Sequence, residues 1–156
     1  MNFNPYDDFV FFDSCAFDGG DHGEQMASEK AREVLEQNKK KVMLMHSVVS
    51  EIKNPNTPDW IQEIEPRSRK TVKLGLIDSE QETLKDIQRI IVGNGNLEKR
   101  EADCFHIFEA QKYGGCFVTS DVGIYKHSDA IKQGYGLNIV KPSEFLELLI
   151  KYSEQT

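Results

Sequence analysis

Four short stretches of the chain are apolar at most of their positions. They span residues 9–12, 42–45, 116–119 and 137–140. A run that is apolar throughout, instead of at alternate positions, is typical of a strand covered on both faces, as in a parallel sheet. We therefore predict four buried strands, the first of which ends directly before Asp13.

Apolar residues at helical spacing separate these strands. The pattern predicts helices over residues 25–37, 48–52, 78–91, 97–113 and 123–133, and a last helix that begins at Pro142. This alternation predicts an α/β fold with three layers, α/β/α, in which helices flank a mostly parallel central sheet.

Three local features are expected at particular positions. Ser47 is the expected N-cap of the helix that follows the second strand. Residues 15–24, which are rich in Gly and Asp, are expected to form a loop. Residues 60–64 suggest a helical turn, and residues 67–76 suggest a short strand or one arm of a hairpin.

Length and composition are typical of a single folded domain over residues 1–156. The chain is 38% hydrophobic and 29% charged, and no apolar run approaches the roughly 20 residues of a membrane helix. The three cysteines, Cys15, Cys104 and Cys116, lie far apart without metal-ligand spacing, which argues against a disulfide framework and against a zinc site. We expect a cytoplasmic protein with no membrane partner.

Four acidic residues lie near the predicted strand ends or on the adjoining helices: Asp13, Glu51, Asp103 and Asp121. Each alone is most simply a turn former, a helix cap or a solvated charge. If all four meet, two carboxylates 4 Å apart repel by about 4 kcal/mol at an effective dielectric constant near 20, so the cluster requires a cation. Oxygen ligands select Mg²⁺ or Mn²⁺, and such ions assist phosphodiester hydrolysis.

The acids are embedded in four segments that together resemble the motifs of PIN-domain ribonucleases. In chain order these are residues 11–14 (FFDS), 48–52 (VVSEI), 102–107 (ADCFHI) followed by Ala110, and 118–124 (VTSDVGI). Four motifs in order, with apolar strands before the first and the last, make the resemblance fairly specific. It extends from about residue 9 to residue 149.

The resemblance implies a PIN-like fold and a function. The family's matching acids bind Mg²⁺ or Mn²⁺ and cleave single-stranded RNA, which would make Asp13, Glu51, Asp103 and Asp121 the metal ligands and catalytic residues. The family's hydroxyl residues match Thr119 and Ser14, which would support the site. Proteins of this size in the family are often toxins of toxin-antitoxin pairs, which implies an antitoxin protein partner and a homodimer.

A net charge of −7 normally counts against a nucleic-acid partner, because phosphates are bound by Lys and Arg. Bound divalent ions offset part of this charge, and a local basic rim is expected from Arg67, Arg69, Lys70, Lys73, Lys99 and Arg100. The four histidines, His22, His46, His106 and His127, have no metal-like spacing and are interpreted as surface or satisfied polar residues.

Other functions remain open from the residues alone. A non-catalytic PIN-like scaffold would bind RNA or protein without cleaving. A phosphatase of the haloacid dehalogenase kind would be phosphorylated on Asp13, but Cys15 stands where an acid/base Asp is expected. A receiver domain would need an earlier acidic pair, and a flap-type DNA nuclease would need a longer chain for its helical arch.

Overall fold

The computed structural model describes residues 3–71 and 75–153, and Lys73 of the expected basic rim lies outside them. Its central sheet has five parallel strands in the order β3-β2-β1-β4-β5. The strands are β1 (Val10–Phe12), β2 (Met43–Leu44), β3 (Arg69–Lys70), β4 (Cys116–Val118) and β5 (Asn138–Val140). The four predicted strands are confirmed, and β3 is a parallel edge strand instead of a hairpin arm.

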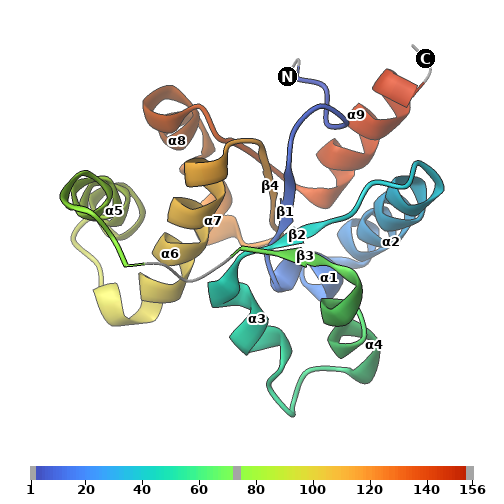
Figure 1. Cartoon of the computed structure of the whole chain (residues 1–156), viewed down its shortest axis with the longest axis horizontal. Helices are drawn as coiled ribbons and strands as arrows, with labels where there is room; N and C mark the ends of the chain where they lie inside the picture. Colours follow the sequence, from blue (N-terminus) through green and yellow to red (C-terminus); the bar gives the residue numbers. More distant parts are fainter. Residues whose placement is uncertain (1–2, 72–74, 154–156) are drawn as a thin grey trace.

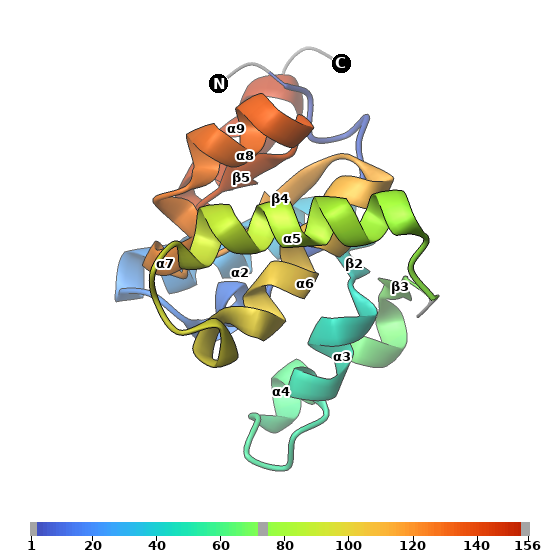
Figure 2. The same cartoon turned by 90° about the vertical axis from the view of Figure 1, so that its left-hand side faces the viewer.

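Helices cover both faces of this sheet (Figure 1), which confirms the predicted three-layer α/β/α fold. One face carries α1 (Cys15–Asp18), α2 (His22–Gln37) and α9 (Pro142–Ser153), which pack together. The other face carries α3 (His46–Ile52), α5 (Asp78–Val92), α6 (Leu97–Tyr113), α7 (Val122–Tyr125) and α8 (Ser128–Tyr135). The short helices α4 (Asp59–Gln62) and η1 (Glu65–Arg67) precede β3, and Figure 2 shows α3 and α4 extending beyond one end of the sheet.

The central strand β1 is buried completely. Phe11 pairs in register with Met43 of β2 and with Phe117 of β4, and all three residues of β1 are fully buried. Phe12 packs against Phe17 and, edge to face, against Phe145, with ring centroids 5.3 and 6.0 Å away. Burying one such aromatic side chain contributes about 1.5–3 kcal/mol, so β1 holds the residue that follows it in a fixed place.

The strand order places a crevice at the end of β1. The chain runs from β1 outward to β2 and β3, and then returns to the other side of β1 to form β4 and β5. The connections after β1 and β4 therefore leave the sheet toward opposite faces. In open α/β sheets, ligands bind at this point, outside the carboxyl ends of the strands.

Three local expectations are corrected. Residues 15–24 are not a continuous loop: Ala16 and Phe17 are buried in α1, and Asp21 caps the N-terminus of α2. The helix after β2 begins at His46 and its N-cap is Met45, not Ser47 as expected. The hydroxyl of Ser47 bonds the His106 ring instead.

The helix expected over residues 123–133 is also corrected, since it is divided into α7 and α8 at His127. Ser128 and Asp129, at the start of α8, are residue types that compete with the helical backbone and favour helix starts.

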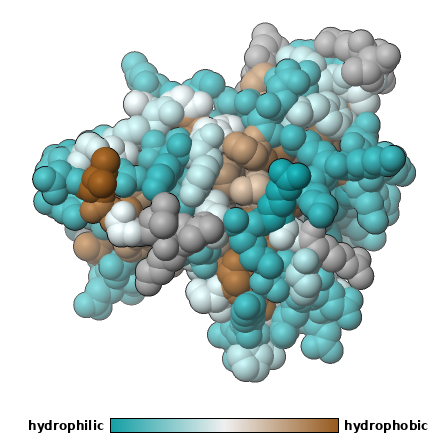
Figure 3. Space-filling view, viewed as in Figure 1, coloured by the Kyte–Doolittle hydropathy of each residue, from teal (hydrophilic) through white to brown (hydrophobic). Residues whose placement is uncertain are grey.

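One face of the molecule is largely polar. The face seen in Figure 3 is mostly hydrophilic, with hydrophobic colour confined to a few small areas. Among the helices of residues 3–71 and 75–153, none has the length and hydropathy that crossing a bilayer requires.

Candidate metal centre

Asp13 lies directly beyond β1, at the carboxyl end of the strand, and is only 3% exposed. One carboxylate oxygen, Oδ1, accepts a hydrogen bond from the Ser14 backbone N–H at 2.8 Å. The other, Oδ2, accepts from the Thr119 hydroxyl at 3.0 Å and from the Cys15 thiol at 3.1 Å. Burial raises the pKa of Asp13, and the charge of His106 and these hydrogen bonds oppose the shift without cancelling it.

Glu51 reaches the same place from α3. The Ser14 hydroxyl donates to Oε2 of Glu51 at 2.6 Å, and the imidazole of His106 bonds Oε1 at 3.0 Å. Burial alone would raise the pKa of Glu51, but the hydrogen bonds from His106 and Ser14 outweigh it, so this pKa lies below its ordinary value. Glu51 is therefore ionised at neutral pH.

His106 is the third member of the cluster and is fully buried on α6. Its Nε2 bonds Glu51, and its Nδ1 bonds the Ser47 hydroxyl at 2.7 Å. Burial lowers the pKa of His106. The hydrogen bond to Glu51 and the charges of Asp13, Glu51 and Asp103 raise this pKa by more than burial lowers it, so the net shift is upward. The prediction that His106 is a satisfied polar residue is correct, but the sequence did not place it in the site.

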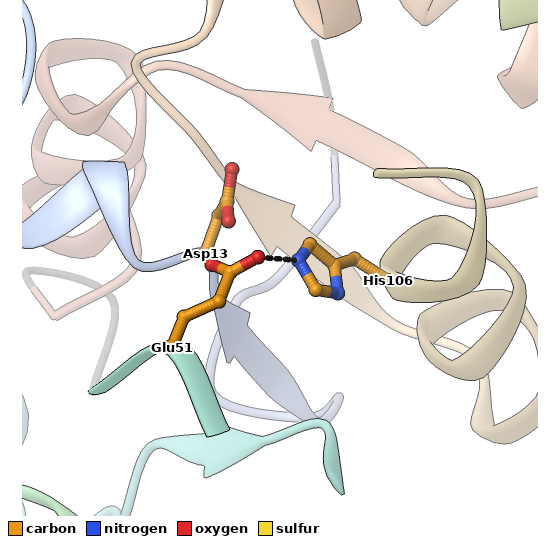
Figure 4. Close-up of side chains that lie close together, drawn as sticks. All are labelled: Asp13, Glu51 and His106. Atoms are coloured by element: carbon orange, nitrogen blue, oxygen red, sulfur yellow. Dashed lines mark hydrogen bonds and ion pairs between the residues drawn. The ribbon is translucent and has the colours of Figure 1, made fainter. Parts of the chain in front are cut away.

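Asp13, Glu51 and His106 come from three elements and converge on one space (Figure 4). One ligand atom of each lies within 4.8 Å of the other two, so the group can hold a metal ion. His106 follows Asp103 by three residues on α6 and shares its helix face, which is the signal by which the sequence could have identified it.

Asp103 and Asp121 are joined to each other by an arginine. Nη1 of Arg100 donates to Oδ2 of Asp103 at 2.7 Å and to Oδ2 of Asp121 at 3.2 Å. Asp121 also caps α7 by accepting from the Gly123 N–H at 2.7 Å. A Cβ on Gly123 would lie 1.6 Å from Nη2 of Arg100, so the absence of a side chain there makes room for the guanidinium group.

The two halves of the site are connected. Thr119, which is fully buried, donates to Asp13 and accepts from the Asp121 backbone N–H at 3.0 Å. Burial raises the pKa of Asp103, and the charge of Asp121 raises it further, whereas Arg100 and His106 lower it. Asp103 therefore interacts electrostatically with Arg100 and Asp121 and also with His106 of the Asp13–Glu51–His106 group.

The six site residues predicted from the sequence thus lie in one connected network. Ser14 links Asp13 to Glu51, and Thr119 links Asp13 to Asp121. Of the expected basic rim, Arg100 lies inside this network, and Lys70 pairs with Glu65 at 2.9 Å.

Comparison of the sequence with models of protein families gives no match, and comparison with curated proteins gives none.

Proposed function

We propose that this chain is a Mg²⁺- or Mn²⁺-dependent endoribonuclease that cleaves single-stranded RNA. The observation that carries the proposal is the convergence of Asp13, Glu51 and His106 within 4.8 Å at the crevice of the sheet. The motifs that contain these residues resemble those of PIN-domain ribonucleases, in the same order along the chain.

The side chains fit a divalent ion. Two carboxylates in a largely buried setting repel each other, and the raised pKa of Asp13 is a sign of the cost of holding its charge there without a metal. Asp13 and Glu51 would hold the ion through oxygen, and His106, once deprotonated and released from Glu51, would add a nitrogen donor, which suits Mn²⁺ better than Mg²⁺. Asp103 and Asp121 would join them once Arg100 moves away.

The bound metal would lower the pKa of a water molecule and offset charge that develops at phosphorus. The residues of the chain would prepare for this step. Thr119 and the Ser14 N–H fix the orientation of the Asp13 carboxylate, and the Ser14 hydroxyl fixes Glu51. Because these contacts hold the carboxylates of Asp13 and Glu51 in place, little reorganisation of these two side chains is needed on binding.

The proposal is tested with a fluorescently labelled single-stranded RNA and a duplex of the same sequence, each with Mn²⁺, Mg²⁺ or EDTA. We expect cleavage of the single strand with Mn²⁺, no cleavage with EDTA, and loss of activity in Asp13→Asn. Asp129→Asn, which changes an exposed acid on α8, is the matched control and should cleave as the unchanged protein does. Full activity of Asp13→Asn would refute the proposal.

A non-catalytic scaffold is the second candidate, because one observation favours it. Arg100 and His106 already neutralise or bond three of the four acids in the absence of any metal. Calorimetric titration with MnCl₂ separates the two functions. Heat of binding that disappears in Asp13→Asn supports the nuclease, and no heat at millimolar Mn²⁺ supports the scaffold.

A toxin role, an antitoxin partner and a homodimer are further parts of the proposal that derive from the resemblance alone. Induced expression should arrest growth of the host cells if the chain is a toxin, and Asp13→Asn should not. Light scattering of the purified chain measures whether it is a dimer.

A further inference from the structure

Three adjoining hollows on the surface lead away from the candidate metal centre. The first is lined by Ser14 and Glu51 of the centre and by Asp18. The second shares Asp18 with the first and is also lined by Arg32 and Trp60. The third shares Arg32 with the second and continues to the C-terminal end of α2. We call this path the α2 track.

The middle of the α2 track is an aromatic and cationic stack. The guanidinium carbon of Arg32 lies 5.6 Å from the ring centroid of Phe17 and 5.0 Å from that of Trp60. Phe17 is buried, whereas 45% of Trp60 is exposed. Among the described residues, no carboxylate lies within ion-pair distance of Arg32, although Glu29 and Glu33 are near enough to interact with its charge. The stack therefore offers an exposed aromatic surface beside a cation.

The far end of the α2 track is basic. Three consecutive lysines, Lys39, Lys40 and Lys41, line the third hollow. Lys40 donates to the backbone carbonyl of Tyr6 at 3.1 Å, whereas Lys39 and Lys41 are exposed. The track also has three acids along it, Asp18, Glu29 and Glu36. Positive charge is thus concentrated at one end, and the carboxylates of the metal centre lie at the other.

This combination is suited to one class of partner. Proteins bind single-stranded nucleic acid with a positively charged groove along the backbone and with aromatic side chains on which bases stack. A duplex keeps its bases stacked inside, so it cannot use Trp60 in this way. An acidic peptide would use the lysines but would gain less from the exposed indole.

We propose that single-stranded RNA lies along the α2 track, with a base stacked on Trp60 beside Arg32 and backbone phosphates against Lys39 and Lys41. The adjoining nucleotides then reach Ser14 and Glu51. As a description of the substrate path, this inference depends on the proposed function. As a binding site, it is measured without metal and without cleavage.

The experiment measures binding of a fluorescein-labelled twelve-residue oligouridylate to the full chain in EDTA. Trp60 is the only tryptophan in the sequence, so its fluorescence reports directly on this position. We expect saturable quenching of Trp60 by the unlabelled oligonucleotide. In fluorescence anisotropy, Trp60→Ala should weaken binding roughly 5- to 160-fold, and Trp60→Phe should retain most of the affinity, since a base can still stack on the phenyl ring.

The lysines are tested by salt dependence. The double variant Lys39→Ala with Lys41→Ala should reduce the slope of log Kd against log salt by about 1.4, because each phosphate contact to a single strand contributes about 0.7. Lys85→Ala, which changes an exposed lysine on α5 across the sheet, is the matched control and should leave the slope unchanged. Circular dichroism confirms that each variant is folded.

Several results would overturn the α2 track. These are binding that is unchanged in Trp60→Ala, equal affinity for a duplex of the same length, and tighter binding of a polyglutamate peptide than of the oligonucleotide. Failure of the proposed function is a separate result, namely the absence of Mn²⁺-dependent cleavage. Cleavage with unaltered binding in the Trp60 and lysine variants would keep the nuclease and reject the track.

Discussion

Replacement of Asp13 by Asn should stabilise the metal-free protein while it removes the response to metal. Burial raises the pKa of Asp13 above its ordinary value, so the native state binds this proton more tightly than the unfolded chain does. Stability from the group is present at low pH and is lost as the pH rises through the folded-state pKa. Above that pKa, the ionised carboxylate costs free energy, which an amide of the same shape does not.

The size of the effect follows from the geometry. Ligand oxygens of Asp13 and Glu51 lie within 4.8 Å of each other, and two unit charges at that distance repel by about 3.5 kcal/mol at an effective dielectric constant of 20. A protonated His106 offsets this repulsion. The full repulsion between Asp13 and Glu51 therefore acts only at alkaline pH, where His106 is neutral. The amide oxygen can accept from the Ser14 N–H but cannot also accept from the Thr119 hydroxyl and the Cys15 thiol, which costs about 1 kcal/mol. From the repulsion alone the net gain is about 2.5 kcal/mol, and the relief of burying the Asp13 charge adds to it.

The assay is thermal unfolding followed by circular dichroism, in EDTA and in MnCl₂, at about pH 6 and about pH 9. For a chain of this length, about 2.5 kcal/mol corresponds to a Tm increase of roughly 5–10 °C at the higher pH. MnCl₂ at about one hundred times its Kd should stabilise the unchanged protein by about 2.7 kcal/mol and should not stabilise Asp13→Asn. Asp129→Asn is the control and should change neither value.

Two results would refute this reasoning. One is a folded Asp13→Asn protein that melts below the unchanged protein in EDTA at the higher pH, which would mean that the buried charge is not a cost. The other is a Mn²⁺-induced increase in Tm that survives the substitution, which would mean that the ion binds elsewhere.

Arg100→Gln should tighten Mn²⁺ binding several-fold in calorimetry, because Asp103 and Asp121 lose their internal cation; these partly exposed pairs contribute at most about 1 kcal/mol each to folding. Gly123→Ala should reproduce that gain with Arg100 intact, since the new Cβ displaces the guanidinium group; unchanged affinity would contradict the proposed competition. The pKa of His106 is raised on folding, so its stabilisation is present below its ordinary pKa and lost as pH rises through the folded value. In urea unfolding, the deficit of His106→Gln should therefore shrink with rising pH, and a constant deficit would refute the assignment.

The fold was predictable because its strands are apolar at nearly every position. Phe11 and Phe12 point to opposite faces of the sheet and both are fully buried, so both faces of β1 are covered. The edge strand β3 gives no such signal, since both of its residues, Arg69 and Lys70, are exposed. These residues form a strand because they pair with β2. That pairing is a tertiary contact, which the local sequence does not reveal.

The acids of the site were predictable from topology, whereas their partners were indicated only by their spacing from Asp103 on α6. Asp13 and Asp121 follow strands that lie side by side, and parallel strands end at the same edge of the sheet. His106 and Arg100 depend instead on how α6 is rotated about its axis. Nearly continuous burial from Cys104 to Ala110 leaves α6 with little amphipathic pattern from which to infer that rotation.

The partners on α6 determine how the site behaves without metal. Four converging carboxylates would repel one another severely, yet the described residues supply partners of their own: the Arg100 guanidinium pairs with Asp103 and Asp121, and His106, whose pKa is raised, bonds Glu51. Asp13 has no such ion pair among the described residues, is the most buried of the four acids, and has a raised pKa. A divalent ion therefore stabilises the site most by offsetting the charge of Asp13. Asp103 and Asp121 become available to the ion only as Arg100 is displaced.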